Sequence, residues 1–89
     1  MSEHYLEQRV LKRVDQETIG LYRCLFRLET KQYGVQSLDF FSLPISSKRF
    51  SESEIQFFEL FCETSPVERC KWYESLSEAI RAHDHDFSE

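Results

Sequence analysis

The sequence predicts an α+β domain in which helices cover one face of a small antiparallel sheet. Two observations predict this class: residues 18–43 have the pattern of a two-stranded hairpin, and residues 51–64 have that of a capped amphipathic helix. The chain has 89 residues, of which 15% are aromatic, and only two are Gly and two are Pro. This composition is typical of a single compact domain over residues 1–89, without flexible linkers.

The hairpin is predicted from alternating polarity. Within its first strand, Tyr22 and Cys24 fall on one face and Arg23 falls on the other, as expected for side chains that repeat every second residue. A turn that ends at Gly34 follows, and then a second strand rich in aromatic and β-branched residues. Strands joined by about four residues pair antiparallel by default. Residues 68–73 are a candidate third strand.

Residues 4–15 fit two structures. Leu6, Val10 and Val14 are spaced at i, i+4 and i+8, with Glu early and Lys and Arg late, which favours a helix whose charges suit its dipole. The stretch RVLKRV also alternates, however, and therefore leaves a strand as the alternative. With the helix, the predicted order of elements is α-β-β-α-(β)-α.

The central helix has the clearest local signal. Ser51 and Glu54 form a capping box, and Phe50 and Ile55 form a hydrophobic staple around it. Pro66 prevents the helix from continuing. We therefore expect this helix to begin at Ser51.

A last helix is predicted from a second capping box, Ser75 with Glu78. It runs into the sequence HDHD, in which His83 and His85 are weak candidates for metal ligands. Residues two apart on a helix point roughly 200° away from each other, so these two imidazoles do not share an ion. We expect a polar helix end that holds neither metal nor cofactor.

The three cysteines indicate neither catalysis nor a disulfide. Cys24, Cys62 and Cys70 include no C-x-x-C pair, and the first residues lack the apolar core of a signal peptide. Both observations favour reduced thiols in the cytoplasm. We expect Cys62 to be a small buried residue and Cys70 to be the most exposed of the three. No glycine-rich phosphate loop occurs either, so the sequence predicts a protein without catalytic residues.

Charge is distributed unevenly along the chain. Residues 1–50 contain eight Lys and Arg against six Asp and Glu, whereas residues 51–89 contain three against ten. The acidic half disfavours nucleic acid as a partner, because such binding needs a clustered basic surface. Arg23 and Arg27 could form a basic surface around the hairpin, although a solvated sheet face is the simpler interpretation. No apolar run is long enough to span a membrane.

The apolar arc of the central helix indicates a contact with another protein. At about 100° per residue the arc covers about 220°, whereas a helix on a sheet needs little more than about 100°. We expect the sheet to cover one side of the arc and to leave Phe57 and Leu60 open to water, with Phe61 beside them. A partner would cover such a patch, and a two-fold homodimer is the commonest arrangement.

The predicted function is that of a small cytoplasmic, non-catalytic protein that acts through protein–protein contacts, as an accessory, regulatory or assembly subunit. One alternative is an acidic inhibitor whose residues 51–89 occupy a basic site on a partner protein; salt-sensitive association would identify it. The other is a minor enzyme or metal-binding domain that uses the C-terminal His and Asp residues. Metal-dependent NMR shifts of His83 and His85 would identify that one.

Overall fold

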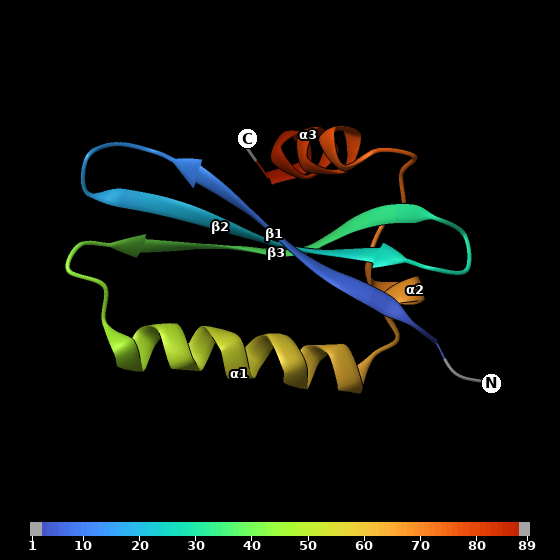
Figure 1. The fold of residues 1–89 in the computed structure, drawn as a ribbon, viewed down its shortest axis with the longest axis horizontal. Helices are drawn as coiled ribbons and strands as arrows, with labels where there is room; N and C mark the ends of the chain where they lie inside the picture. The colour runs from blue at the N-terminus through green and yellow to red at the C-terminus, as the bar shows by residue number, and fades with distance from the viewer. Residues whose placement is uncertain (1–2, 88–89) are drawn as a thin grey trace.

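The structure, a computed structural model, describes residues 3–87 and consists of three strands followed by three helices (Figure 1). In chain order the elements are β1 (Tyr5–Arg13), β2 (Thr18–Arg27), β3 (Gln32–Ser42), α1 (Ser47–Glu63), α2 (Pro66–Arg69) and α3 (Leu76–Phe87). The predicted α+β class is confirmed, and so is the hairpin of residues 18–43. The predicted order α-β-β-α-(β)-α is wrong, because the chain forms β-β-β-α-α-α.

The first segment is a strand and not the favoured helix. β1 pairs antiparallel with β2 along its whole length, from Tyr5 opposite Arg27 to Arg13 opposite Ile19. The spacing of four residues that suggested a helix is also an even spacing, so it places the same apolar residues on one face of a strand. The neighbouring hairpin decides between the two structures, because it supplies a partner for every inward-facing backbone group of β1.

The sheet is a meander in the order β1-β2-β3. Its second ladder contains a bulge: Arg23 lies opposite Ser37 and the next residue, Cys24, lies opposite Val35, so Gln36 is the extra residue. The Gln36 amide Nε2 donates to the carbonyl oxygen of Phe57 in α1, at 3.2 Å. The bulge therefore ties the sheet to the first helix.

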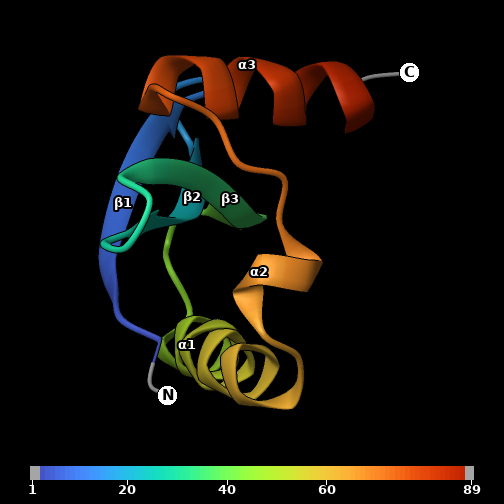
Figure 2. The same cartoon turned by 90° about the vertical axis from the view of Figure 1, so that its right-hand side faces the viewer.

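The two long helices cover opposite faces of the sheet, so the prediction that the helices share one face is wrong. The Tyr22 hydroxyl donates to Asp84 of α3 at 2.7 Å, whereas the next residue, Arg23, donates to Glu54 of α1. Neighbouring residues of a strand point to opposite faces. Figure 2 shows the result, with α3 above the sheet and α1 below it.

The chain crosses from one face to the other along the edge of β3. α2 and the residues after it lie beside that edge (Figure 2), and Tyr73 and Tyr33 exchange backbone hydrogen bonds of 2.8 and 2.9 Å. The predicted strand at residues 68–73 is thus a single bridge. Gly34 permits the close approach, because a Cβ there would lie 3.1 Å from Cys70 Cβ and from the backbone oxygen of Lys71.

The helix starts agree with the prediction at α3 but not at α1. The Ser75 hydroxyl accepts from the backbone N–H of Glu78 at 3.1 Å and donates to its carboxylate at 3.3 Å, which confirms that Ser75 caps the last helix and contacts Glu78. α1 is capped by Ser46, whose hydroxyl accepts from the backbone N–H of Arg49 at 3.2 Å. Ser51 therefore lies inside the helix.

Candidate interaction surface

Arg23, predicted as part of a basic surface, is fully buried between β2 and α1. Its guanidinium donates to Glu54 at 2.6 Å and to Asp39 at 3.1 Å. Ser53 completes the cluster, since its hydroxyl accepts from Arg23 at 2.8 Å and donates to Asp39 at 2.7 Å. The guanidinium carbon also lies 5.7 Å from the centre of the Phe57 ring. A buried charge needs such partners, so Arg23 belongs to the core.

The other arginines of the hairpin region are paired as well. Arg27 is half-buried and lies 3.5 Å from the Glu29 carboxylate. Arg9 of β1 donates to Glu54 at 2.7 Å, so one carboxylate serves both Arg9 and Arg23. These hydrogen bonds, from Arg23 first and then Arg9, lower the pKa of Glu54. The predicted basic surface at Arg23 and Arg27 does not form.

The residues predicted to be open to water on α1 are buried or half-buried instead. Phe57 is only 3% exposed, and Leu60 and Phe61 are half-buried. The Phe61 ring meets Tyr5 of β1 edge-on, with the ring centres 5.6 Å apart. The predicted exposed edge of this helix is therefore wrong for Phe57, while the binding role assigned to the three residues stays a prediction.

The exposed apolar residues of α1 lie on the opposite edge of its arc. Ile55 is 56% exposed, Phe58 is 54% exposed, and Cys62 is exposed too, contrary to the expectation that it would be buried. We call these three residues the outer stripe of α1. Together with Glu59 and Glu63 they line a shallow hollow on the surface.

The ion pairs of Arg23 explain why α1 is oriented with Ile55 and Phe58 exposed. Glu54 interrupts the apolar arc and would be expected to face water, but the buried Arg23 draws it inward. Ser53 contacts Asp39 on β3, and the next residue, Glu54, reaches Arg9 on β1. One further step of about 100° carries Ile55 past β1. The outer stripe therefore lies on the β1 side of the helix.

β1 itself is an edge strand. Backbone bonds at both of its ends join His4 to Leu28 and Val14 to Thr18, so the even-numbered residues bond to β2. The odd-numbered residues, from Tyr5 onward, point their backbone N–H and C=O groups away from the sheet. Within residues 3–87 no other strand pairs with this edge. We call the outer edge of β1 and the outer stripe of α1 together the edge surface.

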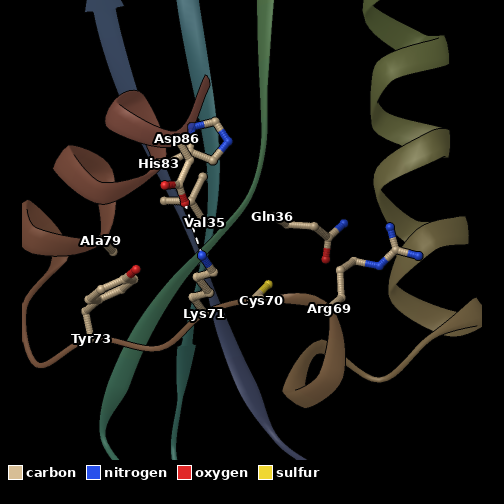
Figure 3. A pocket seen from close by; sticks show the side chains of 9 residues that line it. All are labelled: Val35, Gln36, Arg69, Cys70, Lys71, Tyr73, Ala79, His83 and Asp86. Carbon is tan, nitrogen blue, oxygen red and sulfur yellow. Dashed lines mark hydrogen bonds and ion pairs between the residues drawn. The ribbon is translucent and has the colours of Figure 1, made fainter. Parts of the chain in front are cut away.

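A cavity of about 270 Å³ opens on the other side of the molecule, between β3, α2 and α3 (Figure 3). Burial raises the pKa of the Cys70 thiol, which lies at its wall, to about 11. Burial also lowers the pKa of His83, against the opposing effect of Asp84 and Asp86. Burial therefore keeps the Cys70 thiol protonated at neutral pH, and the thiol is not the reactive form of cysteine. Cys70 is buried, contrary to the expectation that it would be the most exposed cysteine.

The two candidate metal ligands are not brought together. His83 is half-buried and stands edge-on to the Tyr22 ring, with the ring centres 6.2 Å apart, whereas His85 is exposed. Among residues 3–87 there is no group of three or more His, Cys, Asp and Glu side chains that could hold a metal ion. The separation follows from the helical spacing.

Among residues 3–87, fold and surface define a small α+β protein whose three-stranded meander lies between two helices, with β1 unpaired along its outer edge and β3 bridged only at Tyr33. No protein-family model matches the chain, and neither a curated protein nor a solved structure matches it. In the part of the chain that the structure describes, no helix has both the length and the apolar character required to cross a membrane.

Proposed function

We propose that this chain is a non-catalytic protein-interaction subunit of the cytoplasm, and that its edge surface binds the partner. The observation that carries the proposal is the open edge of β1 lying beside the exposed outer stripe of α1. An edge strand offers a row of unpaired N–H and C=O groups to another chain. The neighbouring outer stripe of α1 adds apolar surface that a partner can bury, which backbone pairing alone does not supply.

The energetics support a partner on this surface. Burying one large apolar side chain contributes about 1.5–3 kcal/mol, and Ile55 and Phe58 are both more than half exposed. Exposed apolar residues scattered singly are ordinary, but here they adjoin one another along an unpaired strand. The burial of Arg23 removes one cation from the basic surface that nucleic-acid binding would need, and so favours a protein partner.

Photo-crosslinking in the native host tests the proposal. Phe58→p-benzoylphenylalanine places a crosslinker on the outer stripe, and Arg81→p-benzoylphenylalanine on the exposed side of α3 is the matched control. We expect a defined protein adduct from position 58 and none from position 81. Equal labelling from both positions, or no adduct from either, would contradict the proposal.

A further inference from the structure

The charges along β1 are arranged so that two copies of the strand would attract each other when they lie antiparallel. Glu3 and Glu7 lie at its start, and Arg9, Lys12 and Arg13 lie towards its end. Two copies of the strand, placed antiparallel, therefore bring the acidic part of each beside the basic part of the other. This segment has a small positive charge, whereas the whole chain carries −5, so the edge is a place where two acidic molecules can approach.

The backbone limits the possible registers. Only odd-numbered residues point their hydrogen-bonding groups outward, so in a two-fold pair odd residues must lie opposite odd residues. The two-fold axis must then pass through a residue and not between two. An axis at Glu7 or at Arg9 would set like charges directly opposite each other, which is destabilising. An axis at Gln8 avoids both of these like-charge contacts.

The axis at Gln8 matches side chains as well as charges. Opposite residues would be Glu7 with Arg9 of the second copy, Leu6 with Val10, and Tyr5 with Leu11, each occurring twice. Within one chain Glu7 already lies 3.4 Å from Arg9, so the four charges alternate in sign around the axis. Leu6 and Leu11, which are 50% and 71% exposed, would be covered.

Two further features favour the axis at Gln8. Glu54 contacts Arg9 and Phe61 contacts Tyr5, so the part of α1 between them, which carries Ile55 and Phe58, runs alongside the stretch of β1 from Arg9 to Tyr5. An axis at Gln8 lies within this stretch and brings the two outer stripes nearer to each other than an axis at Val10 would. The buried Gln8 Oε1 has no hydrogen-bond partner among the described residues, and if the side chain turns outward in the pair, the amide of the second Gln8 would supply one.

We infer that the partner of this protein is a second copy of the same chain, joined through β1 with the two-fold axis at Gln8. The product is a continuous six-stranded sheet with both α1 helices on one face. This inference rests on the proposed function, since it names what the edge surface binds.

Mixed cysteine variants test the register. Leu6→Cys and Val10→Cys are made separately, each in a Cys62→Ser chain so that the exposed native thiol is absent. In the inferred register Leu6 and Val10 of opposite copies have Cα atoms about 4.5 Å apart, which suits a disulfide. Two copies of Leu6 would lie about 14 Å apart along the strands. We expect mild oxidation of the mixture to give a disulfide-linked dimer that contains one chain of each variant. Oxidation of either variant by itself should give no linked dimer.

A charge variant tests the affinity. Glu7→Arg gathers four cations around the axis and should weaken self-association at least tenfold in sedimentation equilibrium. Glu74→Arg makes the same change of net charge on the exposed segment after Tyr73, and should stay within about twofold of the natural protein. Equal weakening by both variants would overturn the inference.

The outcomes separate this inference from the proposed function. A monomer mass for the unmodified chain at hundreds of micromolar, or a single cysteine variant that crosslinks as fast as the mixture, overturns the self-pairing. If position 58 then crosslinks to a different protein, the proposed function stands and the partner is another chain. If position 58 crosslinks to this chain itself, both stand.

Discussion

The two edges of the sheet differ in what the chain places beside them. At β3, Tyr73 bridges to Tyr33, and Gly34 gives the crossing segment room to approach. At β1, no described segment pairs with the edge, and the outward surface carries separated acidic and basic residues. The comparison teaches that a chain of this size can cover one end of one edge with its own backbone while it leaves the other edge unpaired within the described residues.

Cysteine reactivity gives the largest expected contrast between the edges. Cys62 is exposed beside the β1 edge, whereas Cys70 is buried beside β3 with a pKa of about 11 and Cys24 is buried with a pKa of about 12. Because the thiolate is the reactive form, alkylation of a dilute sample, in which the chain is monomeric, should at neutral pH modify Cys62 on the order of a hundredfold faster. Peptide mass spectrometry over time measures this, and comparable rates at Cys62 and Cys70 would contradict the burial of the β3 edge.

The ion cluster under β1 gives the next effect. Glu54→Gln leaves the fully buried Arg23 without one carboxylate, and should destabilise the fold by about 2 kcal/mol in chemical denaturation at pH 7. Glu52→Gln, on the exposed side of the same helix, is the control and should change stability by less than about 0.5 kcal/mol. Equal losses for both variants would show that Arg23 does not depend on Glu54.

The same pair of variants predicts a pH dependence. Folding lowers the pKa of Glu54 from 4.5, so its carboxylate stabilises the folded state at pH values above 4.5. That contribution is lost as the pH falls through the lowered value in the folded state. The stability difference between the natural chain and Glu54→Gln should therefore shrink on acidification below 4.5, whereas a constant difference would point to packing alone.

Steric crowding at the covered edge gives a smaller effect. A Cβ at Gly34 would lie 3.1 Å from Cys70 Cβ and from a backbone oxygen, so Gly34→Ala should cost about 1.5 kcal/mol. At Gly20 the nearest atoms are side-chain carbons of Phe40 and Leu38 at 3.3 and 3.4 Å. Those side chains can move, so Gly20→Ala should cost less in thermal or chemical unfolding. The reverse order would mean that the crossing segment does not press on β3.

The helix cap gives the smallest effect. Ser46→Ala removes the acceptor for the Arg49 N–H and should destabilise the fold by about 1 kcal/mol. Ser51 lies inside α1, so Ser51→Ala should stay within about 0.5 kcal/mol of the natural chain. Denaturation midpoints of the two variants decide which serine begins the helix.

Local patterns in the sequence determined the hairpin and the start of the last helix. Alternation around Cys24 and the Ser75–Glu78 pair each depend on residues a few positions apart, which is the range over which backbone preference and capping act. The candidate site was predicted less well. The helical wheel found a wide apolar arc on the central helix, but it selected Phe57 as exposed when Phe58 is.

Only the tertiary structure decided the rest, because the decisive partners lie far apart in the chain. Within residues 4–15, Tyr5–Arg13 forms a strand because β2 supplies the backbone partners, and a four-residue spacing suits either structure. Arg23 is buried and not on the surface because Glu54 of α1 and Asp39 of β3 neutralise its charge. That same contact points Glu54 inward while Ile55 points outward, so one long-range charge pair helps to determine which face of the helix is exposed.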